Sequence, residues 1–394
     1  MLTSHSRSDR QFALAVCLAR IERNQAAAES TLALQLTELK HQIMSAMASK
    51  TSSKTGDLVK NLSAAQRMTT HDLPQEAILT SLRYTEMDYR QDSIVNPDHS
   101  SYSWIFEGSS TTENQPQNRY MSWLSEDDGI FWVTGKPGSG KSTLMKHIYK
   151  DERTHSALET WTNGRRLFTA SHYFWHAGSQ VEKSYAGLIR SILYKILFSC
   201  PDLIGSVCKS RWHAELRGRD TSILPWSIDE LYGCLNALVS ENLEFGGKGI
   251  CFCFFIDGLD EYDGNHEVID ALVRLSQSGQ TKFCASSRPW NRFNDAFKAS
   301  KLKGNYLELH QHTRSDIAEY VEKEFGSKFS GLSEVYQDWE PLVREVIDRS
   351  EGVFLWVALV VKRELRPMLE DRESIAAIRS RLEEVPSGMI ATMI

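Results

Sequence analysis

The chain has 394 residues, of which 41% are hydrophobic, 10% aromatic and 24% charged, and its formal net charge is −6. This composition excludes a fully disordered chain, which needs few hydrophobic residues and a high net charge. The acidic balance argues against general affinity for nucleic acid or for an anionic membrane surface. The length predicts roughly two or three domains.

No apolar stretch is long enough for a membrane-spanning helix, which needs about 20 apolar residues. The most apolar runs, residues 250–256 and 353–361, are far shorter. The N-terminus is polar and lacks the apolar core of a secretory signal. The seven cysteines are scattered and show no Cys-x₂₋₄-Cys pair, so we expect no zinc site, reduced thiols and a cytoplasmic location.

The first 75 residues are predicted to form a helical region. Leu32, Leu36, Leu39, Ile43 and Met47 follow a spacing of three or four residues, and no Gly or Pro interrupts them. Two interpretations remain open. One is a helical element that packs on its own domain, and the other is a coiled-coil arm that binds an unknown protein partner.

A linker and adaptor segment is expected over residues 76–118. A short helix begins it, at about residues 74–84, and the chain is then rich in loops from residue 96, apart from the apolar cluster 102–106. Strands and helices alternate from residue 129 to about residue 300. This rhythm predicts an α/β fold with a doubly wound, mostly parallel sheet.

Residues 305–394 are predicted to be a helical subdomain. Thr313 and Asp316 resemble a capping box in front of its first helix, and Pro367 is expected to interrupt a later one. Further helices are expected at 339–350, 353–365 and 374–384.

The strongest chemical signal fits the pattern G-x-x-x-x-G-K-[ST] at every fixed position. It consists of Gly135, Lys136, Pro137, Gly138, Ser139, Gly140, Lys141, Ser142 and Thr143. Glycines let the main chain wrap closely around phosphates, and successive N–H groups form an anion nest at a helix N-terminus. Lys141 would supply a cation for the β- and γ-phosphates and Ser142 a hydroxyl ligand for Mg²⁺. The pattern therefore predicts ATP or GTP, with Mg²⁺, as the ligand.

An apolar run over residues 250–256 leads into Asp257, Asp260 and Glu261. A buried strand with this ending delivers a carboxylate to the sheet edge at which ligands bind in open α/β sheets. We expect Asp257 to hold Mg²⁺ opposite Ser142. Either Glu261, which we favour, or Asp260 would polarise the attacking water.

The strand expected within residues 281–289 ends in small polar residues and Arg288. An arginine there is suited to reach the γ-phosphate, although a plain surface arginine is the alternative. His172, in an apolar strand, is expected to be a packed histidine and not a ligand. Ser227 and Glu230 predict a capping box for the helix that follows.

Together these motifs resemble the NACHT domain of fungal STAND-class NTPases. The surroundings of the glycine-rich run also resemble the nephrocystin-type N-terminal NTPase region. The resemblance covers about residues 80–385. It depends mainly on 131–148, 254–264 and 284–290, with support from 82–94, 102–106, 307–321 and 352–361.

The resemblance implies a P-loop NTPase domain at residues 119–304 that acts as a nucleotide-controlled switch, as in fungal incompatibility or immunity-like signalling. The resting form holds a diphosphate, exchange for a triphosphate permits self-association, and hydrolysis is slow. The resemblance assigns phosphate binding to residues 135–143, Mg²⁺ to Ser142 and Asp257, an extended acidic pair to Asp260 and Glu261, and a sensor role to Arg288. Family members continue into a winged helix and repeats, so the helical subdomain is expected to be truncated before the winged helix.

Two other classes of function are weighed against the switch. The first is a turnover enzyme, either an AAA-like ATPase or a small-molecule kinase, but the sequence identifies no acceptor pocket or lid. The second is a scaffold that keeps only the fold. The intact set of Lys141, Ser142, Asp257 and Glu261 argues against a scaffold.

Overall fold

The computed structural model describes residues 74–97, 101–107, 116–240, 243–264, 267–298, 305–326 and 339–388. The helical region predicted for residues 1–75 therefore lies almost wholly outside the described residues. The described residues fall into two compact units, 74–81 with 208–224 and 82–207 with 225–388. The smaller unit contains α10 (Lys209–Leu216) and most of α3 (Pro74–Leu82), the short helix predicted near residue 74.

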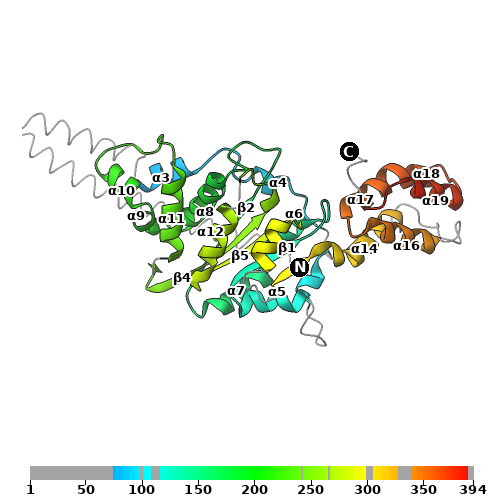
Figure 1. Ribbon diagram of the computed structural model, residues 1–394, viewed down its shortest axis with the longest axis horizontal. Helices are drawn as coiled ribbons and strands as arrows, with labels where there is room; N and C mark the ends of the chain where they lie inside the picture. The colour runs from blue at the N-terminus through cyan, green and yellow to red at the C-terminus, as the bar shows by residue number, and fades with distance from the viewer. Residues whose placement is uncertain are drawn as a thin grey trace, which may run out of the picture. The chain divides into compact units, whose positions relative to one another are not determined.

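The larger unit is built on a sheet with the strand order β2-β4-β5-β1-β6, in which all neighbours are parallel (Figure 1). The strands are β1 (Gly129–Thr134), β2 (Arg166–Tyr173), β3 (Glu244–Phe245), β4 (Lys248–Asp257), β5 (Thr281–Ser287) and β6 (Tyr306–Glu308). Strand β3 pairs antiparallel with β4 across Gly246 and Gly247, and both glycines have positive φ, as a tight hairpin requires. The predicted mostly parallel α/β class is confirmed.

Helices cover both faces of this sheet. On one face α5 (Pro116–Ser125), α6 (Lys141–Lys150) and α7 (Glu152–Thr162) share a core with Phe131, Cys253 and Phe255. On the other side lie α8 (Tyr185–Ser199), α11 (Ile228–Ser240) and α12 (Glu267–Leu275), as Figure 1 shows. Strands β1, β4 and β5 are buried along almost their whole length, as expected for a parallel sheet covered on both faces.

Short elements connect these layers. They are α4 (Tyr89–Ser93), α9 (Ile204–Val207), α13 (Asn291–Phe293), a π-helical turn (Asn294–Lys298) and 3₁₀ turns at Ser103–Ile105, Pro201–Leu203, Leu259–Glu261, Ser276–Ser278 and Leu309–Gln311. The domain limit predicted after residue 118 falls within α5.

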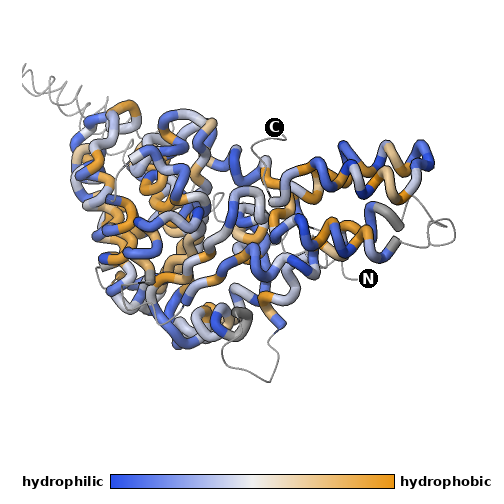
Figure 2. Tube along the Cα trace, turned by 45° about the vertical axis from the view of Figure 1, so that its right-hand side comes forward, coloured by the Kyte–Doolittle hydropathy of each residue, from blue (hydrophilic) through white to orange (hydrophobic). Residues whose placement is uncertain are grey.

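The C-terminal helices form a core of their own, around residues such as Ile317, Val346, Trp356 and Leu382, all fully buried. The helices are α14 (Arg314–Gly326), α16 (Trp339–Ser350), α17 (Phe354–Leu359), a π-helical turn (Val360–Leu365), α18 (Arg366–Glu370) and α19 (Ile375–Glu384). Hydrophobic and hydrophilic residues alternate along them (Figure 2). The helices predicted in this part of the chain are therefore present.

Two local predictions here are wrong. Pro367 does not interrupt the helix, because the wider π-helical turn at Val360–Leu365 precedes it and Pro367 begins the next helical segment, where its missing N–H costs little. Thr313 and Asp316 do not form a reciprocal capping box. Thr313 Oγ1 donates to the Gly352 carbonyl at 3.0 Å, and the Asp316 carboxylate accepts from the Trp104 indole at 3.0 Å.

The Glu230 N–H donates to Ser227 Oγ at 3.1 Å and so caps the start of α11, which is one half of the predicted capping box. The prediction of a packed histidine at position 172 is confirmed. His172 is 2% exposed within β2, and burial, with the charge of Lys195, lowers its pKa to about 3. A neutral, packed imidazole follows from this burial.

Among the described residues, no helix has both the length and the apolar character that a membrane crossing requires. The six described cysteines are buried and free of disulfide bonds.

Gly352 lies at the turn between α16 and α17 and has φ +76°. A Cβ there would lie 1.8 Å from the His310 carbonyl oxygen. We expect Gly352→Ala to lower the free energy of unfolding by at least about 3 kcal/mol, because strain and a backbone clash add together. Gly279→Ala is the matched control, since Gly279 has φ +65° and nothing within 4 Å of the added Cβ. It should cost about 1 kcal/mol in urea unfolding, and equal losses in the two variants would contradict the assigned clash.

Candidate functional site

The glycine-rich loop, residues 135–140, joins β1 to α6. Gly138 and Gly140 have φ of +71° and +95°, which side chains disfavour. At Gly140 a Cβ would also lie 2.4 Å from the hydroxyl of Tyr102. The loop therefore has the tight, glycine-dependent path that the pattern predicts.

Lys141, the first residue of α6, folds back over this loop. Its Nζ donates to the carbonyl oxygens of Gly135 at 2.8 Å and Lys136 at 3.0 Å. Burial lowers the pKa of Lys141, while the carboxylates of Asp260 and Asp257 act in the opposite direction. The ammonium thus lies between the loop and the acidic end of β4.

The predicted metal pair, Ser142 and Asp257, is brought together. Asp257 ends β4, is 2% exposed, and accepts a hydrogen bond from Ser286 Oγ at 2.5 Å. Burial raises the pKa of Asp257, and hydrogen bonds from Ser142 and Ser286 oppose that rise. A hydroxyl and a carboxylate are hard oxygen donors of the kind Mg²⁺ takes, so this pair fits that ion.

Sequence reasoning did not assign a role to Ser286. It is the penultimate residue of β5, which runs parallel to β4 with Ala285 opposite Ile256, so Ser286 lies next to Asp257. Its hydroxyl also accepts from the Gly258 N–H at 3.0 Å. The sequence signal for this role is the pair of serines, Ser286 and Ser287, at the carboxyl end of β5, the strand next to the one that ends in Asp257.

The two acids after Asp257 have different environments. The side chain of Asp260 is 4% exposed and holds Arg288, accepting from its main-chain N–H at 2.9 Å and pairing with its Nε at 3.0 Å. Glu261 instead accepts from the His176 N–H at 2.8 Å. Burial raises the pKa of Glu261, against that hydrogen bond. Glu261 is thus free of a cationic partner within hydrogen-bond distance among the described residues.

Arg288 follows β5 and its side chain is 44% exposed. It lines the same cavity as Lys141 and Glu261. The pairing with Asp260 fixes its position at the strand's end, so a role as sensor stays a prediction.

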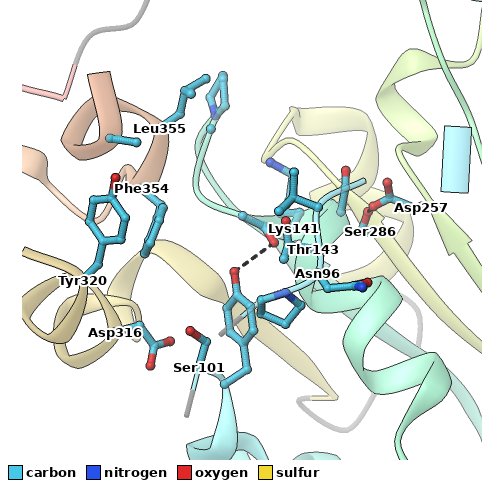
Figure 3. Close-up of a pocket in the computed structure, with 18 of the residues that line it drawn as sticks. Asn96, Ser101, Lys141, Thr143, Asp257, Ser286, Asp316, Tyr320, Phe354 and Leu355 are labelled. Atoms are coloured by element: carbon cyan, nitrogen blue, oxygen red, sulfur yellow. Dashed lines mark hydrogen bonds between the residues drawn. The ribbon is translucent and has the colours of Figure 1, made fainter. Parts of the chain in front are cut away.

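A second set of residues, from segments outside the predicted motifs, also reaches the loop. Tyr102 has φ +62°, and its hydroxyl donates to the Gly140 carbonyl at 3.4 Å, the dashed line in Figure 3. Two positions on, the Trp104 indole donates to Asp316 of α14 at 3.0 Å. The apolar cluster 102–106 therefore links the glycine-rich loop to the C-terminal helices.

The start of α17 contacts the loop directly. The Leu355 N–H donates to the Gly138 carbonyl at 3.0 Å, and Lys136 pairs with Glu351 at 2.7 Å. The first N–H groups of a helix have no partner within it, so the loop carbonyl serves as the acceptor for Leu355. Sequence reasoning missed this contact because it joins residues more than 200 positions apart.

These groups surround a cavity of about 720 Å³. Figure 3 shows Lys141, Asp257 and Ser286 on one side and Tyr320, Phe354 and Leu355 on the other. The rings of Tyr320 and Phe354 lie 5.0 Å apart. A charged side suited to phosphate thus faces an apolar side suited to a flat ring, within the usual volume range of ligand sites.

Comparison with known proteins agrees with this geometry. Residues 104–288 match the family described as nephrocystin 3, N-terminal. The chain is also 23% identical over 296 residues to the vegetative incompatibility protein HET-E-1 of Podospora anserina. That similarity covers 73% of this chain, which spans about a fifth of the length of the relative. The resemblance inferred from the motifs is confirmed, and the fold is an α/β P-loop NTPase fold.

Proposed function

Proceeding from this similarity, we propose that the chain is a nucleotide-controlled switch that binds a purine nucleoside triphosphate with Mg²⁺ and hydrolyses it slowly. Its output would be a change in conformation and self-association, in signalling of the vegetative incompatibility kind. The observation that carries the proposal is the hydrogen bond between Leu355 and Gly138, because it joins the phosphate-binding loop to the C-terminal helices.

The charged side of the cavity supports triphosphate binding. A phosphate in the glycine-rich loop would meet main-chain N–H groups, the N-terminus of α6 and the ammonium of Lys141. The Lys141 ammonium now donates to the neutral carbonyl oxygens of Gly135 and Lys136. A phosphate that enters the loop would compete with these carbonyl oxygens for the same ammonium N–H donors.

Ser142 and Asp257 are the residues that would hold Mg²⁺. Held there, Mg²⁺ would supply positive charge against the negative charge that develops on the phosphates. Glu261 would orient the attacking water or accept a proton from it, and burial raises the pKa of Glu261 in the direction that a general base needs. Asp260 would act indirectly, by positioning Arg288.

The C-terminal helices supply the conformational half of the proposal. Leu355 and Glu351 join them to the glycine-rich loop itself. Asp316 joins them to Trp104, two residues after Tyr102, whose hydroxyl reaches the loop. A ligand shifts an equilibrium only through contacts that differ between two states. The hydrogen bond from the Leu355 N–H to the Gly138 carbonyl would be such a contact, because phosphate binds to the same loop.

The test is hydrogen exchange of the full chain with ADP and with Mg²⁺ and the non-hydrolysable triphosphate AMP-PNP, repeated with the guanine nucleotides. We expect the amides of residues 351–359 to exchange at different rates in the two nucleotide states. Amides of α19, whose hydrogen bonds lie within its own helix and core, serve as the control. Identical exchange of residues 351–359 in the two states, with both nucleotides bound, would count against a switch.

A further inference from the structure

Arg90 is an arginine of the cavity that the motifs did not single out. It lies in α4, which is fixed against the end of β2 by several contacts. Asp88 pairs with Lys195 at 2.9 Å, and the ring centroids of Tyr89 and Trp175 are 5.6 Å apart. The main chain directly before Arg90 is therefore held in place.

Arg90 lines the cavity with Lys141, Asp257 and Glu261. Its Cζ lies 6.0 Å from the ring centroid of Trp175. The next residue, His176, donates its main-chain N–H to Glu261. Its Nε is buried and has no hydrogen-bond partner in the part of the chain that the structure describes. Within that same part, no carboxylate lies at ion-pair distance from it.

Arg288 differs in this respect. Its charge is paired with Asp260, whereas the charge of Arg90 acts at longer range on the two acids of the site. Burial is the main influence on the pKa of both Asp257 and Glu261 and raises it, and Arg90 lowers it in each case. Arg90 is thus a fixed cation with unused donors at the end of the cavity where the metal and water would lie.

We propose that Arg90 contacts the terminal phosphate of a bound triphosphate and so discriminates it from a diphosphate. This inference rests on the proposed function. A guanidinium presents several N–H donors in a planar fork that matches phosphate oxygens, and it stays charged at any physiological pH. Lys141 is hydrogen-bonded to the loop and would bind the phosphates of both the diphosphate and the triphosphate. Arg90 acts on Asp257 and Glu261 and would contact only the terminal phosphate of the triphosphate.

A purely structural role is the competing explanation, because a cation over a tryptophan ring also stabilises packing. Such a role predicts that removal of Arg90 weakens both nucleotides alike or neither of them. The two roles are therefore separated by the ratio of the two affinities.

The experiment is calorimetric titration of the full chain with ADP and with AMP-PNP, each with Mg²⁺, or with GDP and GMP-PNP if the wild type selects guanine. We expect Arg90→Gln to weaken triphosphate binding about 10-fold, the effect of one lost charge-assisted contact, and diphosphate binding less than about 2-fold. Arg83→Gln is the matched control, since Arg83 is exposed directly after α3 and does not line the cavity, and it should bind both nucleotides as the wild type does.

Arg90→Lys keeps the charge and a cation near Trp175, so it carries the test if Arg90→Gln unfolds at a lower temperature than the wild type. It should still lose about 3-fold in triphosphate affinity, because an ammonium lacks the planar fork. Equal losses for the two nucleotides, or none, would overturn the inference while leaving the proposed function standing. A wild-type protein that binds neither nucleotide would overturn the proposed function itself.

Discussion

Lys141→Ala is expected to weaken binding of both nucleoside di- and triphosphates about 100-fold. The ammonium is hydrogen-bonded to the glycine-rich loop and lines the cavity. The loss of two charge-assisted hydrogen bonds from it to phosphate would account for an effect of this size. The fold should persist, because the side chain's hydrogen bonds are to loop carbonyls that water can reach once it is gone. Titration calorimetry and far-UV circular dichroism measure the two effects.

Lys136→Ala is the matched control for this variant. Lys136 is in the same loop, but its ammonium pairs with Glu351 at 2.7 Å and does not line the cavity. Its loss should change nucleotide affinity by less than about 3-fold, since exposed ion pairs contribute little. If Lys141→Ala bound nucleotide as tightly as this control, the loop would not be the phosphate site.

Glu261→Gln is expected to keep nucleotide affinity and to slow phosphate release at least about 100-fold. Glutamine preserves the acceptor for the His176 N–H, so the loop geometry is kept while the basic oxygen is lost. The expected size is that of a removed general base. Binding is measured by titration and hydrolysis by phosphate release under single-turnover conditions.

Asp260→Asn decides between the two acids. Asp260 holds Arg288 through two hydrogen bonds, so an asparagine at this position should disturb the arginine. The rate of phosphate release should therefore fall less than it does in Glu261→Gln. An unchanged rate in Glu261→Gln together with a large loss in Asp260→Asn would transfer the base role to Asp260.

The core of the fold and the charged half of the site could be predicted because both follow from local patterns. An apolar strand before Gly135 and another before Asp257 are enough to place their ends at one edge of a parallel sheet. This logic brought Ser142 and Asp257 together correctly. The G-G pair at Gly246 and Gly247 also marks the β3–β4 hairpin, which the sequence reasoning overlooked.

The other half of the site depends on contacts between distant segments. The apolar cluster at Tyr102 gives no hint in sequence that its hydroxyl reaches Gly140, since that requires a left-handed backbone at Tyr102. The spacing of Thr313 and Asp316 predicts a capping box, but the Asp316 carboxylate accepts a hydrogen bond from the indole of Trp104 instead. In the same way, Pro367 is expected to interrupt a helix, but a preceding π-helical turn accommodates it.

The nucleotide content and turnover of the purified full chain decide whether the protein is a nucleotide switch. The protein is denatured, the released nucleotide is identified, and phosphate release is then followed with Mg²⁺ and ATP or GTP. For a switch we expect a co-purified purine diphosphate and turnover far below about 1 s⁻¹, the low end for typical enzymes. Nucleotide-free protein that turns over at tens per second would contradict it and would favour an AAA-like ATPase or a kinase.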